Sequence, residues 1–470
     1  MNLLNDEKLT IAGIAPLIRK KQISPVELTE FSLERIHRLQ PKLNAFITVT
    51  PELAQKQARQ AEREILRGKY RGPLHGIPIS LKDLFYTAGI RTTAGSKILR
   101  NFVPRENAVV VDRLLEAGAV LLGKTNLHEF AYGVTSNNPH YGPVHNPWDL
   151  ERVSGGSSGG SAAAVSTAQG FASLGTDTGG SIRIPSAACG VVGLKPTRGL
   201  VSLDGVIPLA FSLDHVGPIC RCVEDAALML EVIASPAGRG SSTWPQMGRL
   251  FPRPLRRGVR GIRVGIPGQY FFDRLDKNVR GYVLTAFAIL YQQGAELREV
   301  ECRWMKDAAP LVGVITVGEA LSFHWKWLRS RRGDYGADVR KRMEANRSQR
   351  TVDYLQAQEK RRMYTQAFLK VFESVDVVAA PTLPVLPPLI GQKKIEWGRT
   401  QEDVRAALLR MTRPGNLTGL PAISLPCGYT AHNLPVGLQL LGRHYDEATL
   451  LRAAYAFEQA TPWRKMFPPL

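Results

Sequence analysis

Apolar positions in the first seventy residues recur at the spacing of one helix face. Ser24 precedes a proline and stands three positions before Glu27, which is the pattern of a helix N-cap with a capping box. Apolar side chains follow as far as position 36, and Pro41 is expected to end this helix. Residues 51–67, polar and rich in Ala and Gln, predict a second helix. We therefore interpret residues 1–70 as N-terminal helices.

From position 74 onward, short apolar runs of strand length alternate with stretches of helical length. The predicted strands are residues 74–81, 119–122, 191–194, 263–267, 375–379, 422–425 and 436–440. One predicted helix begins at position 109. The others are residues 277–293, residues 305–370 with an interruption near Gly333, and residues 446–459. Alternation of this kind is typical of proteins whose sheet is covered by helices, so the pattern predicts an α/β fold.

Two stretches rich in glycine and serine interrupt this pattern: residues 155–161 (GGSSGGS) and residues 175–183 (GTDTGGSIR). Glycine at this density indicates backbone that approaches another group closely or takes positive φ. Consecutive N–H groups in such loops form a concavity for an anion. The pair suits acyl transfer, in which one loop supplies a serine nucleophile and its N–H groups hold the oxyanion. A flexible linker is disfavoured, because the apolar residues 162–165 and 184–185 favour burial.

Two other motifs match formally. Residues 118–125 fit the G-x-x-x-x-G-K-[ST] pattern of a phosphate-binding loop, but the predicted strand 119–122 occupies the place of the loop. Residues 155–159 fit the G-x-S-x-G of an α/β-hydrolase, which needs a histidine later in the chain. The later histidines are His215, His324, His432 and His444. We disfavour the phosphate-binding loop and leave the histidine triad as an open alternative.

The two glycine-rich stretches, together with residues 76–83 (GIPISLKD), resemble the signature of the amidase-signature family. In that family the serine after Thr-Gly-Gly is the nucleophile, here Ser181. The first serine of the Ser-Ser pair, which follows a cis peptide bond in the family, is the middle of a proton relay, here Ser157. The lysine that ends the Gly-Ile-Pro strand is the base, here Lys82. Similar stretches at residues 123–126, 189–197, 214–218 and 416–421 extend the resemblance over nearly the whole chain.

The resemblance implies one large α/β/α layered domain, residues 1–470, around a mixed central sheet. Its parts would be the N-terminal helices 1–70, a catalytic core 71–235, a cap-like insertion 236–370, and residues 371–470 with the rest of the sheet and a closing helix. Further site residues follow from the same resemblance. They are an oxyanion hole at Thr178, Gly179 and Gly180, supporting side chains Thr176 and Arg183, and a substrate pocket at Phe130, Tyr132, Gly133 and Val134.

A lysine can act as a base only when it is neutral. A free lysine with a pKa of about 10.4 is protonated at neutral pH, but burial lowers that pKa by up to several units. The apolar strand before Lys82 is suited to bury it. We infer that neutral Lys82 draws a proton from Ser157, which draws one from Ser181, so that the serine can attack a carbonyl.

Composition is that of an ordinary globular protein, with 44% hydrophobic and 22% charged residues, but the net charge of +20 is unusual. The excess lies in residues 249–263 and 326–362. No nucleic-acid motif accompanies it, so solvated surfaces are favoured over nucleic-acid binding. The five scattered cysteines predict buried, reduced thiols. We expect no secretory signal, no membrane span, no metal and no cofactor, and therefore a cytoplasmic location.

The substrate class is left broad: a small amide, an anilide, a carbamate or urethane, or an ester. Phe323 and Trp327, one helical turn apart, could form an aromatic entrance suited to bulky substrates. The alternative function is the A subunit of a glutamyl-tRNA amidotransferase. Against it stand residues 202–205 (SLDG), where that protein has Ser-Arg-Tyr/Phe-Gly, and Leu409, where it has an acidic residue. A non-catalytic binding protein is disfavoured because all three relay residues are present; a monomer or homodimer is expected.

Overall fold

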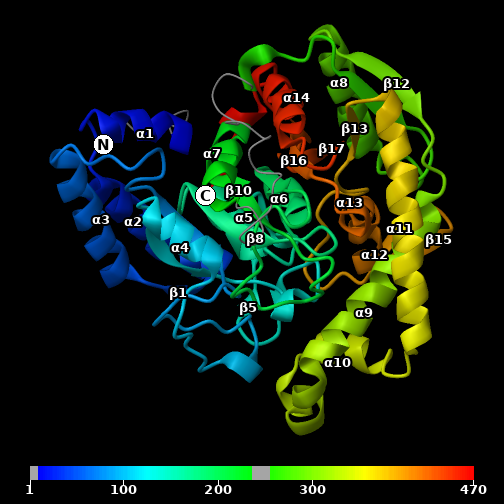
Figure 1. Ribbon diagram of the computed structural model, residues 1–470, viewed down its shortest axis with the longest axis horizontal. Helices are drawn as coiled ribbons and strands as arrows, with labels where there is room; N and C mark the ends of the chain where they lie inside the picture. The colour runs from blue at the N-terminus through cyan, green and yellow to red at the C-terminus, as the bar shows by residue number, and fades with distance from the viewer. Residues whose placement is uncertain (1–8, 235–254) are drawn as a thin grey trace.

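The computed structural model describes residues 9–234 and 255–470, and one mixed eleven-stranded sheet runs through them (Figure 1). In sheet order the strands are β1 (Phe46–Val49), β3 (Val120–Thr125), β2 (Pro78–Lys82), β8 (Ala172–Thr176), β10 (Val216–Cys220), β9 (Val192–Lys195), β16 (Ala422–Tyr429), β17 (Pro435–Gly442), β13 (Val377–Pro381), β11 (Arg263–Pro267) and β12 (Glu296–Val300). Strand β2 pairs in parallel with β3 and β8, and β11 with β12 and β13; the other pairs are antiparallel.

Helices cover both faces of this sheet. They are α1 (Ile11–Arg19), α2 (Pro25–Leu43), α3 (Pro51–Leu66), α4 (Val109–Glu116), α5 (Gly159–Ser166), α6 (Arg183–Cys189), α7 (Val223–Ile233), α8 (Lys277–Gln292), α9 (Met305–Ser330), α10 (Ala337–Glu344), α11 (Thr351–Ser374), α12 (Val404–Arg410), α13 (Arg413–Thr418) and α14 (Glu447–Gln459). Successive residues of β3 divide between two cores: Leu121 packs in the core that contains α7 and α14, and Leu122 in the core that contains α2 and α3. The predicted α/β/α layering around a mixed sheet is confirmed.

The N-terminal region follows its predicted pattern with two differences. Ser24 caps α2 through the capping box with Glu27, as the sequence predicts. Pro41 does not end that helix, because α2 continues to Leu43 and Asn44 closes it in the left-handed conformation. Residues 46–49, predicted as part of the helical region, form the edge strand β1.

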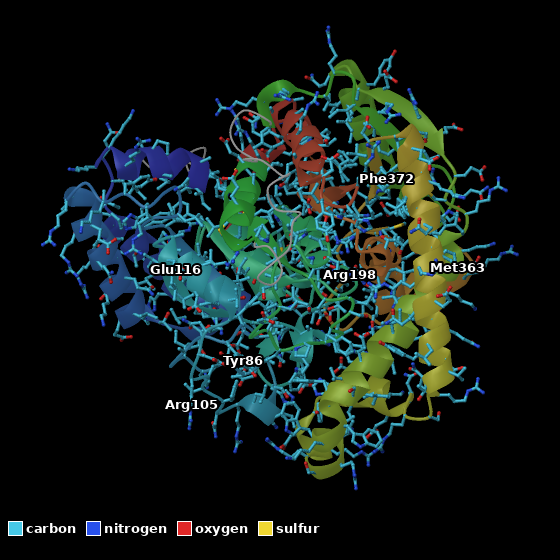
Figure 2. The ribbon with its side chains drawn as sticks, viewed as in Figure 1. Tyr86, Arg105, Glu116, Arg198, Met363 and Phe372 are labelled. Carbon is cyan, nitrogen blue, oxygen red and sulfur yellow. The ribbon has the colours of Figure 1, made fainter. Side chains whose placement is uncertain are left out.

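Residues 236–370 are predicted as a cap-like insertion, of which 236–254 lie outside the described residues; the described part contains two strands of the main sheet, β11 and β12. Helices α9 to α11 follow them and lie on the far side of the molecule from α1 to α3 (Figure 1). On α11, Met363 is exposed, whereas Phe372 is buried in a core shared with the sheet (Figure 2). Three small hairpins lie outside the main sheet: β4 (Asn137–Asn138) with β5 (Gly142–Pro143), β6 (His145–Asn146) with β7 (Asp149–Val153), and β14 (Lys394–Trp397) with β15 (Thr400–Asp403).

Much of the positive charge between positions 326 and 362 is paired locally. Arg350 binds Asp353 at 2.8 Å, and Arg362 binds Glu359 at 2.8 Å, both on exposed helix faces. The other predicted basic segment, residues 249–263, lies in part outside the described residues. All five cysteines are buried and have free thiols. Within residues 9–234 and 255–470, no helix has the length and apolarity of a membrane span, and no cluster of metal-ligating side chains occurs.

Candidate active site

Lys82 is the last residue of β2, and every residue of that strand is buried. Its Nζ donates hydrogen bonds to Ser157 Oγ at 2.7 Å and to Thr176 Oγ1 at 2.8 Å. Among the described residues, no carboxylate lies within ion-pair distance of this amine. The structure thus brings together the three side chains from β2, from the first glycine-rich stretch and from the end of β8.

The electrostatic environment of Lys82 favours its neutral form. Burial lowers the pKa of Lys82 from 10.5 to about 7, and the carboxylates of Asp214 and Asp177 oppose that shift only in part. The cause is desolvation, since the ammonium cannot be hydrated in the interior. An amine that is partly neutral at pH 7 can accept a proton from the serine it contacts.

Ser157 is held in place on the loop between β7 and α5. The peptide bond between Gly156 and Ser157 is cis. The carbonyl of Ser157 accepts hydrogen bonds from Ser136 Oγ and from the backbone N–H of His128, each at 3.2 Å. A Cβ on Gly156 would lie 2.8 Å from the backbone nitrogen of Ser136, which explains the requirement for glycine there. These contacts fix the hydroxyl of Ser157 beside Lys82.

The second glycine-rich stretch is organised by Asp177. Its carboxylate accepts from the backbone N–H of Ile182 at 3.1 Å and from Asn416 Nδ2 at 2.8 Å. Gly180 has a φ of +138°, a conformation that glycine adopts readily. No acceptor within the described residues binds the backbone N–H groups of residues 178–181. This loop therefore offers a row of free donors beside Ser181, as an oxyanion hole requires.

Arg183, at the start of α6, is fully buried and locks Asp177 in place. Its Nε and Nη2 bind the two carboxylate oxygens at 3.1 and 3.0 Å, and its Nη1 donates to Gln439 Oε1 at 2.6 Å. Burial by itself raises the pKa of the Asp177 carboxyl, but the guanidinium of Arg183 holds it well below its usual range. The loop at 177–181 thus depends on a buried ion pair.

We expect Arg183→Met to destabilise the protein by about 3–5 kcal/mol, because it leaves the carboxylate of Asp177 buried without its counter-charge. The measurement is thermal unfolding followed by circular dichroism, together with turnover at a temperature where the variant is folded. Arg63→Met, on an exposed position of α3, is the control and should unfold as the wild type does. Equal melting temperatures for the two variants would contradict this role for Arg183.

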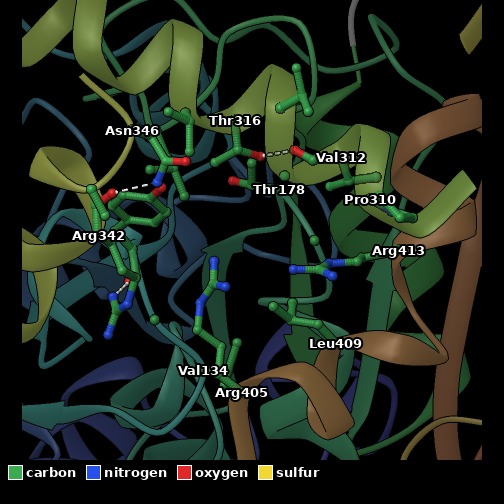
Figure 3. A pocket seen from close by; sticks show the side chains of 18 of the residues that line it. Val134, Thr178, Pro310, Val312, Thr316, Arg342, Asn346, Arg405, Leu409 and Arg413 are labelled. Atoms are coloured by element: carbon green, nitrogen blue, oxygen red, sulfur yellow. Dashed lines mark hydrogen bonds between the residues drawn. The ribbon is translucent and has the colours of Figure 1, made fainter. Parts of the chain in front are cut away.

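A cavity of about 570 Å³ opens at Ser181. Figure 3 shows it from close by, with Thr178 and Leu409 among the labelled side chains of its wall. Thr178, Gly179 and Ser181 form part of its wall, and the first half of α9 forms another part. Three of the predicted pocket residues also line it: Tyr132, Gly133 and Val134. Lys82, Ser157, Thr176 and Arg183 lie behind this wall and are buried.

Phe130 does not line the cavity, which corrects its predicted place in the substrate pocket. Its backbone has a φ of +49°. The centroid of its ring lies 4.4 Å from the ring centroid of His324 and 6.0 Å from that of Trp327. Phe323 and Trp327 are not in the cavity wall either. The predicted aromatic entrance is therefore an aromatic cluster that joins α9 to Phe130, outside the cavity wall.

Sequence patterns do not indicate the charged residues of the cavity. Arg342 from α10, Arg405 from α12 and Arg413 from α13 all line it. They come from three separate helices and belong to none of the motifs described above. Leu409, which stands where the amidotransferase protein has an acidic residue, also lines the cavity.

The two formal motif matches do not describe this site. Lys124, the lysine of the phosphate-loop pattern, is buried in β3 and donates to Thr87 Oγ1 and Thr92 Oγ1 at 3.0 and 2.9 Å. His215 is buried, and its Nδ1 contacts the carbonyls of Leu213 and Asp177 rather than a serine. Lys82, not a histidine side chain, is the group that contacts the hydroxyl of Ser157.

Comparison with known proteins identifies the family of this chain. The family model described as Amidase matches residues 27–451. The chain belongs to the amidase-signature family. A glutamyl-tRNA(Gln) amidotransferase A subunit from Carboxydothermus hydrogenoformans is 40% identical over 487 aligned positions, covering 98% of this chain and 99% of the relative.

Two solved structures show the same fold over most of their length. One comes from an inhibitor-bound vestigial protein complex that reveals the evolutionary origins of an s-triazine catabolic enzyme; it is 35% identical with a TM-score of 0.89 and covers 96% of this chain and 98% of that one. The other is a bacterial aryl acylamidase, which is 26% identical with a TM-score of 0.86 and covers 97% of this chain and 96% of that one. The family thus includes amidases and an amidotransferase component of nearly the same length.

Proposed function

We propose that this family member hydrolyses the amide-type C–N bond of a small molecule through an acyl-enzyme on Ser181, with Ser157 and Lys82 as its proton relay. The observation that carries the proposal is the buried contact of 2.7 Å between Lys82 Nζ and Ser157 Oγ. A pKa of about 7 for Lys82 supports its role as the base. Ser181 lies in the cavity wall beside free backbone donors, where a carbonyl substrate can reach it.

The reaction proceeds in two balanced halves. Lys82 accepts the proton of Ser157, and Ser157 accepts the proton of Ser181, whose oxygen bonds to the substrate carbonyl carbon. The carbonyl electron pair moves to its oxygen, which the backbone N–H groups of residues 178–181 stabilise. When the C–N bond breaks, the relay returns the proton to the leaving nitrogen. Water then attacks the ester through the same relay, which releases the acid and restores Ser181.

The structure removes the main reason to prefer an anilide or a carbamate over a simple amide as the substrate. An aromatic entrance favours bulky or aryl substrates, but Phe130, Phe323 and Trp327 lie outside the cavity wall. The relationship to an aryl acylamidase is compatible with an anilide, and nothing in the cavity selects it. We therefore propose a small-molecule amidase. The charged side chains of its cavity indicate the substrate better than its aromatic side chains do.

A second candidate is the A subunit of a glutamyl-tRNA(Gln) amidotransferase, and the curated relatives, at 40–41% identity over nearly the whole chain, favour it over a broad free-standing amidase. In that role the same relay would release ammonia from glutamine, and the chain would work with partner proteins and tRNA. Leu409 in the cavity wall counts against it, because a leucine offers no counter-charge for the ammonium of glutamine.

The test is hydrolysis by the purified chain alone of an aliphatic amide, an anilide, an aryl carbamate, an ester and glutamine. Turnover of any of the first four that is absent in Ser181→Ala supports the free-standing amidase. Activity on glutamine only, or only with tRNA and partner proteins, establishes the amidotransferase component instead. Undiminished turnover by Ser181→Ala would overturn both.

A further inference from the structure

Two half-buried arginines line the cavity without an ion-pair partner among the described residues. Arg405 and Arg413 come from the neighbouring helices α12 and α13, and both project into the cavity that contains Ser181 (Figure 3). Among the residues that the structure describes, neither one has a carboxylate within ion-pair distance, and the Nε atom of each is buried without a hydrogen bond. Arg405 instead faces the ring of Tyr132 at 5.7 Å.

The remaining charges of the cavity wall do not neutralise this pair. Arg342, a third arginine of the wall, is bound to Asp338. Asp353 is the acidic side chain of the described wall, and it binds Arg350 at 2.8 Å. Arg405 and Arg413 therefore leave a net positive charge inside the cavity.

Such a pair is unfavourable without a ligand. Burial, followed by the repulsion of Arg413 and Arg342, lowers the pKa of Arg405 to about 10. Burial also lowers the pKa of Arg413. Each guanidinium presents a planar set of donors that fits a carboxylate, and an anion between the two would offset both the repulsion and the unmade hydrogen bonds.

We propose that Arg405 and Arg413 bind a carboxylate of the substrate, so that the enzyme acts on a small anionic amide without an ammonium group. This inference rests on the proposed amidase function of the same cavity. It also distinguishes the substrate from glutamine, whose carboxylate suits the arginines but whose ammonium would meet Leu409 and like charges in the same wall. The two arginines therefore set the selectivity of the site.

A matched series of primary amides tests the proposal directly. Glutaramate carries only a carboxylate, glutamine carries a carboxylate and an ammonium, pentanamide is neutral, and 5-aminopentanamide is cationic. We expect kcat/KM for glutaramate to exceed that for pentanamide by about 10- to 100-fold, the effect of hydrogen bonds to a charged group. Glutamine and 5-aminopentanamide should be poorer than glutaramate. Equal rates for glutaramate and pentanamide would overturn the anionic substrate while leaving the amidase proposal intact.

Substitution of the arginines assigns the selectivity to them. In Arg405→Met and Arg413→Met, the ratio of kcat/KM for glutaramate to that for pentanamide should fall by about tenfold or more. Arg362→Met removes an exposed, ion-paired arginine of α11 and serves as the charge-matched control with the wild-type ratio. A ratio that falls equally in the control would assign the effect to overall charge and overturn the assignment to these two side chains.

A binding measurement on a variant that cannot turn over substrate tests the anion site independently of the proposed amidase activity. Calorimetry with Ser181→Ala should show glutaramate binding at least about tenfold tighter than pentanamide. Adding Arg405→Met or Arg413→Met should remove that difference. If the wild type hydrolyses no amide but the binding difference is present, the proposed function fails and the anion site stands. If turnover is present but binding shows no preference for glutaramate, the anion site fails.

Discussion

Ser181→Ala should lose about 10⁵-fold or more in kcat, because the proposed acyl-enzyme cannot form without the hydroxyl. The protein should stay folded, since no hydrogen bond to Ser181 Oγ occurs within the described residues and its loop is held by Asp177 and Arg183. The measurement is single-turnover release of ammonia or amine from whichever substrate of the panel the wild type cleaves, with the melting temperature recorded in parallel.

Ser186→Ala is the matched control for this loss. Ser186 is also buried on α6, close to Ser181 in the chain, but its hydroxyl donates to the carbonyl of Ile182 at 2.8 Å and does not reach the cavity. The control should keep turnover close to that of the wild type. If Ser186→Ala lost as much activity as Ser181→Ala at an unchanged melting temperature, the nucleophile assignment would fail.

Lys82→Met should lower kcat/KM by about 10³-fold, within the range that a general base contributes. In the wild type, kcat/KM should fall about tenfold per pH unit below pH 7 and level off above it. The sign follows from the lowered pKa of Lys82, about 7: as pH falls through that value the amine becomes protonated and cannot accept a proton from Ser157. The measurement is a pH–rate profile that extends from about two units below this pKa to about two units above it.

Lys124→Met distinguishes this effect from the loss of any buried lysine. Lys124 lies on the adjacent strand β3, is equally buried, and binds backbone and threonine oxygens away from the serines. Its removal should lower the melting temperature, because Asp83 loses its nearby cation. The midpoint of the pH–rate profile should be the same as in the wild type. A midpoint that moves in Lys124→Met, or a wild-type profile without a midpoint near the pKa of Lys82, would contradict Lys82 as the base.

The elements with strong local patterns are well predicted from the sequence. The capping box of α2, the strand β11 and the helix α8 occur at or within a residue or so of their predicted positions. The sequence does not indicate β1, because four residues between two helices carry no distinctive period. The prediction that Pro41 ends α2 is wrong, because the helix continues through Pro41 to Leu43 and forgoes only the one hydrogen bond that a backbone N–H at position 41 would donate.

Sequence alone determined which candidate catalytic residue types are present and where they stand: Lys82 after an apolar strand, and Ser157 and Ser181 within glycine-rich loops. Those features are local, since glycine permits the loop backbone and an apolar strand favours burial. Only the tertiary structure decided that Phe130 faces α9, that Asp177 and Arg183 hold the loop beside Ser181, and that Arg405 and Arg413 meet in one cavity. These contacts join segments far apart in the chain, and their energies depend on desolvation and on neighbouring charge, which exist only once the sheet and its helices have assembled.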